Sequence, residues 1–166
     1  GYNPLFKHIL LDAAVLAAYR EWAYDHVMDY WGGMLEKGGD TWWAKYDPAV
    51  NGPIDGVPLC CGAGAVPNAF LTAEIVGLRP AAPGFTAAYF NPLVKGPSTI
   101  AARIPTAHGH VDVQWKTENG EVNAHIHASY PLDLIPMLAP ELEEKTTLHV
   151  SDNVALLLSG EESEPA

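Results

Sequence analysis

The spacing of hydrophobic residues changes once along this chain, and that change constrains the fold more than any other feature. Up to about residue 78, apolar residues recur every three to four positions, which is typical of helices that bury one side. From Phe85 onward they alternate with polar residues, which is typical of half-buried strands. We therefore predict a mixed fold of helices followed by strands, with one domain over residues 1–80 and another over residues 81–166.

Three helices are expected in the first part. Asn3-Pro4 supplies an N-cap and a first-turn proline, Gly38-Gly39 ends the second helix, and the third covers about residues 65–76. Three helices with one apolar stripe each cannot close a core, so we infer that they are the end of a larger helical domain. The stripes expected to be buried in the first two helices consist of Leu5, Ile9, Ala13 and Leu16, and of Ala23, Val27, Tyr30, Trp31 and Met34.

The second part contains six short alternating segments, separated by turn residues, that predict strands. The clearest pair flanks Asn119-Gly120, which favours a type I′ hairpin turn. That turn sets a register in which Gln114 faces His125 and Asp112 faces His127. The six segments are residues 85–92, 98–105, 110–115, 122–128, 146–150 and 154–159.

The predicted register gathers polar side chains on one side of this hairpin, which we call the histidine face. Imidazoles and a carboxylate together could bind zinc or another divalent ion. The alternative is an ordinary polar outer face of a sheet whose other face is core. Because side-chain proximity alone is not ligand geometry, we expect no bound metal. The histidine face comprises His110, Asp112, Gln114, His125 and His127.

Two neighbouring tryptophans, Trp42 and Trp43, precede a loop rich in Pro, Gly, Asn and Asp. Both could be core or both a platform for sugar rings, but opposite orientations at the end of an element favour one of each. Asp40 and Asp47 flank the pair, and glycoside hydrolysis uses two carboxyl groups, one on each side of the bond. The structural alternative is that Asp40 caps a turn and Asp47 is an ordinary loop residue before Pro48.

The net charge of −11, with no cluster of Lys or Arg, argues against nucleic acid and against a membrane surface as partners. A neutral carbohydrate is compatible with this charge. The adjacent Cys60 and Cys61 alone supply neither a disulfide framework nor a zinc site. We favour two buried thiols over a vicinal disulfide or a reactive thiol, and we expect no cofactor.

Two segments resemble bacterial α-L-rhamnosidases and the related six-hairpin glycosidases. They are YWGGMLEKGGDTWWAKYDP, residues 30–48, and the stretch beginning LCCGAGAVP, residues 59–94, which follow each other at the family's interval. The resemblance implies the last helices of an (α/α)6 barrel followed by a C-terminal antiparallel β-sandwich. It also implies a glycoside hydrolase that cleaves a terminal glycosidic bond. Its implied partners are a carbohydrate or glycoside and an upstream chain carrying the rest of the barrel.

The chain departs from this family at residues that matter for chemistry. Ala44 stands where the family has the Glu thought to be the general base of an inverting hydrolysis, and Cys61 stands where a His contacts the sugar. Trp43 matches the family and implies a stacking wall. Alternatives are a sugar-binding or scaffolding relative that lost hydrolysis, and a relative with changed chemistry such as a lyase. We expect Asp40 and Asp47 to be catalytic, and Trp42, Trp43, Tyr46 and Cys61 to bind substrate.

Overall fold

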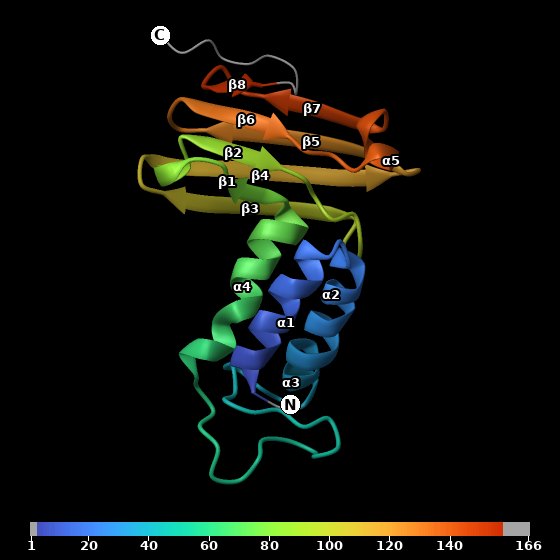
Figure 1. The fold of residues 1–166 in the computed structure, drawn as a ribbon, viewed down its shortest axis with the longest axis vertical. Helices are drawn as coiled ribbons and strands as arrows, with labels where there is room; N and C mark the ends of the chain where they lie inside the picture. The colour runs from blue at the N-terminus through green and yellow to red at the C-terminus, as the bar shows by residue number, and fades with distance from the viewer. Residues whose placement is uncertain (1–2, 158–166) are drawn as a thin grey trace. The chain divides into compact units, whose positions relative to one another are not determined.

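The fold, seen in a computed structural model that describes residues 3–157, divides into two compact units, residues 1–70 and residues 71–166. Helices form the first unit, and two sheets form most of the second (Figure 1). The predicted order of helices before strands is confirmed. The division at residues 80 and 81 into a barrel fragment and a sandwich domain stays a prediction.

Two helical stretches lie side by side in the first unit (Figure 1). Helix α1 (Pro4–Leu16) begins as predicted, because the Asn3 Oδ1 accepts a hydrogen bond from the Leu5 backbone N at 2.8 Å. The second stretch ends where Gly38 adopts a φ of 82°, a left-handed conformation that favours glycine. This second stretch consists of α2 (Arg20–Val27), a π-helical turn (Met28–Gly32) and α3 (Gly33–Glu36).

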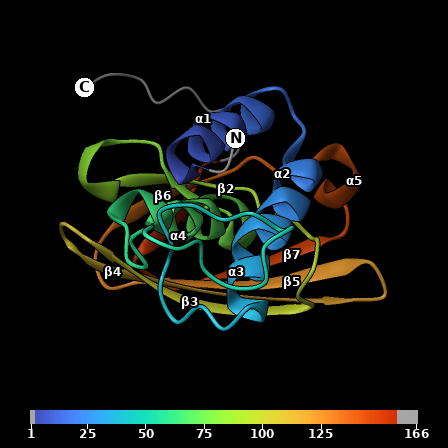
Figure 2. The same cartoon turned by 90° about the horizontal axis from the view of Figure 1, so that it is seen from below.

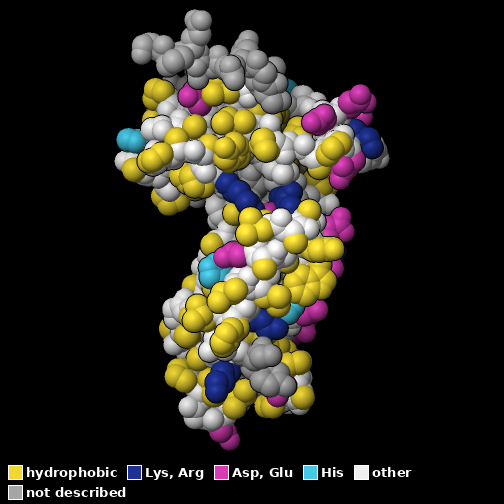
Figure 3. Space-filling model, viewed as in Figure 1, with side chains coloured by type: hydrophobic (Ala, Val, Ile, Leu, Met, Phe, Trp, Pro, Cys, Tyr) yellow, Lys and Arg dark blue, Asp and Glu magenta, His cyan; other side chains and the backbone are white. Residues whose placement is uncertain are grey.

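The apolar stripes of the two helical stretches differ in their burial within this chain. The stripe of the second stretch, from Ala23 to Met34, is buried as expected. The stripe predicted for α1 is not covered within this chain, because Leu5, Ile9 and Leu16 are 52%, 59% and 87% exposed, and its burial by an upstream chain stays a prediction. Helix α1 instead buries Pro4, Leu11 and Ala14. The described helices of this unit cover only one side of α1, and Figure 3 shows hydrophobic side chains on the surface of the helical unit.

The third predicted helix is confirmed, but it is not one regular α-helix. It begins as a 3-10 turn (Gly62–Ala65), continues as α4 (Val66–Phe70), and ends as a π-helical turn (Leu71–Val76). Within the first unit, the Trp31 Nε1 donates a buried hydrogen bond of 2.9 Å to the Gly64 O. That bond ties the start of the third helix to the π-helical turn of the second stretch.

Two four-stranded sheets lie one over the other in the second unit (Figures 1 and 2). Their strand orders are β1-β2-β6-β8 and β3-β4-β5-β7. Alternate side chains of the strands are buried, so each sheet turns one apolar face to the core of this unit. The strands are β1 (Leu78–Pro80), β2 (Ala87–Phe90), β3 (Thr99–Thr106), β4 (Gly109–Glu118), β5 (Glu121–Ala128), β6 (Leu132–Pro136), β7 (Thr146–Val150) and β8 (Val154–Leu156).

The hairpin register predicted from the Asn119-Gly120 turn is confirmed. Both turn residues have positive φ, 51° and 82°, as a type I′ turn requires. Strands β4 and β5 pair with Gln114 opposite His125 and Asp112 opposite His127. Alternate residues in the middle of the hairpin, including Val113 and Ile126, are therefore buried, while the histidine face points outward.

The sheets are mixed, so the prediction of an antiparallel sandwich is wrong. β2 pairs with β6, β6 with β8, and β5 with β7 in parallel. After β2 the chain leaves the first sheet and forms β3, β4 and β5 in the second sheet. It then returns to the first sheet as β6, beside β2. A long connection of this kind allows the two neighbouring strands to be parallel.

Several short elements were not predicted: β1, β6, a 3-10 turn (Pro83–Phe85) and α5 (Pro140–Glu143). Residues 158 and 159 of the last predicted strand lie outside the described residues. Among residues 3–157, no helix is long and apolar enough to cross a membrane.

Candidate functional site

Two loop segments of the first unit lie against each other and bring several predicted site residues together. The Cys61 N donates to the Trp42 O at 2.9 Å, and the Ala44 N donates to the Pro58 O at 3.0 Å. The Thr41 hydroxyl also donates to the Leu59 O. These hydrogen bonds hold residues 41–44 beside residues 58–61, although the two segments belong to no regular sheet.

A pocket of about 390 Å³ opens along this pairing. Of the predicted residues, Asp40, Trp42 and Cys61 line it, whereas Thr41 and Cys60 were not predicted. An indole, a carboxylate, a hydroxyl and thiols around one pocket suit a small ligand that has both apolar faces and hydroxyl groups. The lining residues are Leu35, Asp40, Thr41, Trp42, Cys60, Cys61, Gly62 and Ala65.

The two tryptophans point in different directions, as predicted, but their assignment is reversed. We expected Trp43 to be the open wall. It is instead only 3% exposed, and its ring lies 6.3 Å from that of Tyr46 between centroids. Trp42 is half-buried and lines the pocket. Because successive side chains of an extended segment point to opposite sides, burying Trp43 in the core leaves Trp42 facing the pocket.

Tyr46 is a buried packing residue in this unit. It is 4% exposed, and its ring meets the ring of Tyr30 edge to face at 5.4 Å. Burial, and after it the charges of Glu36, Asp47 and Asp29, raises the pKa of Tyr46. Burial also raises the pKa of Tyr30 to about 12. The predicted role of Tyr46 in binding substrate stays a prediction.

The two predicted catalytic carboxylates occupy different surroundings. Asp40 is exposed and lines the pocket. Asp47 is half-buried, and its Oδ1 accepts a hydrogen bond from the Ala49 backbone N at 2.9 Å, which agrees with the structural alternative that Asp47 is an ordinary loop residue. The catalytic roles of both residues stay predictions.

The adjacent cysteines are free, but the prediction that both are buried is wrong. Cys60 is exposed and Cys61 is half-buried. Their segment pairs with residues 41–44 at the surface, and both residues line the pocket instead of entering the core. Nothing in the hydrophobic spacing predicts this pairing of two irregular segments, which is why Thr41 and Cys60 were missed.

Comparison with known proteins shows which family this chain resembles. Residues 77–130 match the family model described as the bacterial alpha-L-rhamnosidase C-terminal domain. A GH78 family rhamnosidase of Bacillus sp. GL1 is similar over 95% of this chain, with 20% identity and a TM-score of 0.75. The resemblance of the chain to the C-terminal part of bacterial α-L-rhamnosidases is thereby confirmed.

Two further structures show the same fold over less of the chain. An α-L-rhamnosidase from Dictyoglumus thermophilum is similar over 72% of it, with 22% identity and a TM-score of 0.60. The α-L-rhamnosidase of Streptomyces avermitilis, solved with L-rhamnose, is similar over 56%, with 22% identity and a TM-score of 0.51. The chain spans 17%, 14% and 10% of the lengths of the Bacillus, Dictyoglumus and Streptomyces chains. A search of curated proteins gave no match.

Proposed function

We propose that this chain is the C-terminal portion of a glycoside hydrolase resembling α-L-rhamnosidases, which cleaves a terminal glycosidic bond together with upstream barrel residues. The observation that carries this proposal is the match of residues 77–130 to the rhamnosidase C-terminal domain. The fold likeness to GH78 enzymes over 95% of the chain supports it further. The substrate class is a terminal α-L-rhamnoside, by analogy with these relatives.

The upstream barrel accounts for the uncovered side of α1. Phe6, Ile9 and Leu16 are 67%, 59% and 87% exposed along this one helix, which is costly in water. Helices of an (α/α)6 barrel packed on this stripe would bury it, with a total interface well above ~2,000 Å², as obligate interfaces have. A well-folded monomer of residues 1–166 alone, by ultracentrifugation and NMR dispersion, would contradict this part of the proposal.

The pocket beside Trp42 is the proposed sugar site. The half-buried indole offers a face on which a pyranose ring stacks, and the Asp40 carboxylate accepts hydrogen bonds from sugar hydroxyls or from a water molecule. An inverting hydrolase needs two carboxyl groups about 6.5–9.5 Å apart. Asp40 is the carboxylate among the lining residues, so the general acid is proposed to come from the upstream barrel. Cys61 then borders the sugar where the family has a His.

Ala44 favours a second candidate function. A methyl group cannot take a proton from water, so a chain that has Ala at the family's base position is suited to binding a glycoside without hydrolysing it. The same substitution is compatible with changed chemistry, such as that of a lyase. If hydrolysis occurs without the usual base, Asp40 and Asp47 are the carboxylates of this segment that could take its place.

Replacing Ala44 with the Glu of the family distinguishes hydrolysis from binding alone. In the proposed enzyme, Ala44→Glu places a base where water is activated, and hydrolysis of an aryl α-L-rhamnoside should rise by about 10²–10⁴-fold. The matched control is Ala49→Glu, which adds the same charge to an exposed position of the following loop. Rhamnoside binding without hydrolysis in both the unmodified protein and Ala44→Glu would support the binding module instead. If the unmodified protein hydrolyses its substrate and Ala44→Glu slows it, Ala44 does not mark a lost base, and Asp40 and Asp47 are the next residues to replace.

A further inference from the structure

The second unit carries a cluster of imidazoles that the proposed glycosidase function does not use. The histidine face of β4 and β5 is extended by His149 of β7, which pairs with His125 in the sheet register. The rings of these two histidines stack with centroids 4.5 Å apart and planes at 13°. A hollow of about 460 Å³ lies over this part of the sheet, and Asp112, His127 and His149 are among its lining residues.

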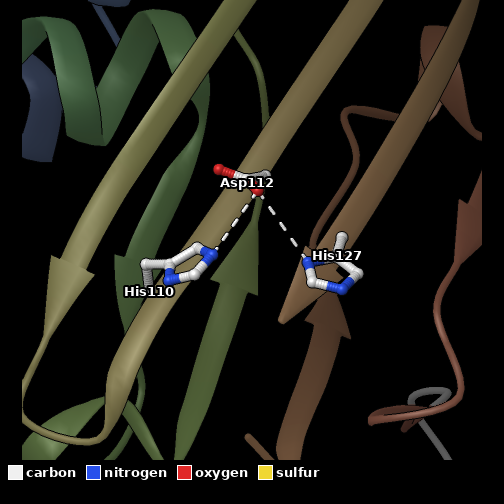
Figure 4. A group of neighbouring side chains, drawn as sticks. All are labelled: His110, Asp112 and His127. Atoms are coloured by element: carbon white, nitrogen blue, oxygen red, sulfur yellow. Dashed lines mark ion pairs between the residues drawn. The ribbon is translucent and has the colours of Figure 1, made fainter. Parts of the chain in front are cut away.

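Three side chains of the face converge on one point (Figure 4). The Asp112 Oδ2 lies 3.7 Å from the His110 Nε2 and 3.8 Å from the His127 Nδ1. One ligand atom from each residue lies within 4.8 Å of the other two, and no other such group of His, Cys, Asp or Glu occurs among residues 3–157. The convergence follows from the fold, because His110 and Asp112 are two apart on β4 and His127 is the cross-strand partner of Asp112.

These separations are close to those of a metal site. Ligand atoms around a tetrahedral zinc ion, with metal bonds of about 2.0–2.1 Å, lie roughly 3.3 Å from one another. The two separations from the Asp112 Oδ2 exceed that value by less than 1 Å, and the two histidine nitrogens lie within 4.8 Å of each other. His110 and His127 are 35% and 56% exposed, so their rings can turn by the small amount needed. Two imidazole nitrogens and one carboxylate oxygen favour zinc-like ions over Mg²⁺ and Ca²⁺, which prefer oxygen ligands.

Arg103 holds the carboxylate in place. Its Nε donates to the Asp112 Oδ1 at 2.7 Å, and its Nη2 donates to the Oδ2 at 2.9 Å. Partners of this kind orient metal ligands in many sites. The hydrogen bond from Arg103 is also the main cause that lowers the pKa of Asp112.

We propose that His110, Asp112 and His127 bind one divalent first-row transition ion of the zinc type, with water completing the coordination. The sequence alone led us to expect no metal, because the register does not show ligand distances. The site lies wholly in the second unit, so it does not depend on the proposed glycosidase function.

Isothermal titration of the metal-free protein with Zn²⁺ tests the proposal. We expect one ion per chain, and His110→Ala, His127→Ala and Asp112→Asn should each weaken binding at least about tenfold, since losing even an outer partner costs ~10–100-fold. His125→Ala and His149→Ala are matched controls, because they remove exposed imidazoles from the same face and should leave the affinity unchanged. Circular dichroism establishes that each variant is folded, and His110→Gln and His127→Gln replace any alanine variant that is not.

Several results would overturn the site. One is the absence of Zn²⁺ binding to the folded protein. Another is binding of several ions that is weakened equally by His125→Ala or His149→Ala, which would show a diffuse surface of imidazoles and no defined site. Ca²⁺ binding with an affinity equal to that of Zn²⁺ would also contradict the nitrogen ligands on which the proposal depends.

Discussion

Replacing each member of the tryptophan pair tests how the structure divides their roles. Trp43 is 3% exposed in the core of the first unit, so Trp43→Ala removes a buried indole and should cost about 3–5 kcal/mol of unfolding free energy. Trp42 is half-buried and already contacts solvent at the pocket, so Trp42→Ala should cost roughly 1–2 kcal/mol. The difference between the two variants is the quantity that the structure predicts.

Urea unfolding followed by far-ultraviolet circular dichroism measures this difference, because removing an indole would itself change the fluorescence. With a slope of about 2 kcal/mol per molar urea, Trp43→Ala should lower the midpoint by roughly 1.5–2.5 M, and Trp42→Ala by less than about 1 M. Trp43→Phe, which keeps an aromatic ring in the core, should recover part of the loss. Equal midpoints for the two alanine variants, or a larger loss in Trp42→Ala, would refute the assignment of Trp43 to the core.

Three further predictions concern other parts of the chain. Gly64→Ala would place a Cβ 2.6 Å from the Cβ of Trp42 and should lower stability by about 1–3 kcal/mol in urea unfolding, with a changed shape of the pocket. Arg79→Ala removes an ion-pair partner of Glu74, whose side chain is 2% exposed, and should lower the urea midpoint, whereas Arg79→Lys should lower it less. Burial is the main cause that lowers the pKa of His26, so the folded state binds fewer protons than the unfolded state. The protein should therefore become less stable, with a lower urea midpoint, as the pH drops below about 6.5. His26→Gln should make the midpoint less dependent on pH.

The elements set by local signals could be predicted from the sequence. Asn3 caps α1 through its own side chain, and the positive φ of Asn119 and Gly120 fixes the β4–β5 register. That register is sufficient to place Asp112 opposite His127. Each of these features depends on residues close together in the chain, where turn and cap chemistry leaves few alternatives.

The features that depend on distant segments could not be predicted. His149 joins the histidine face only through the parallel pairing of β5 and β7, which no turn specifies. Trp42 and Cys61 line one pocket because two irregular segments pair across a long loop. The exposed stripe of α1 shows the same effect, because hydrophobic spacing identifies a face to be buried but not the partner that buries it.

The most direct test of the proposed function is the release of sugar from an aryl α-L-rhamnoside by the full-length protein, followed by NMR of the first product formed. The account predicts free L-rhamnose with inverted configuration at the anomeric carbon, and loss of this release in Asp40→Asn and in Trp42→Ala, with Asp133→Asn of the second unit as an unaffected control. Binding of the rhamnoside with no release of rhamnose, in a protein shown to be folded, would contradict it.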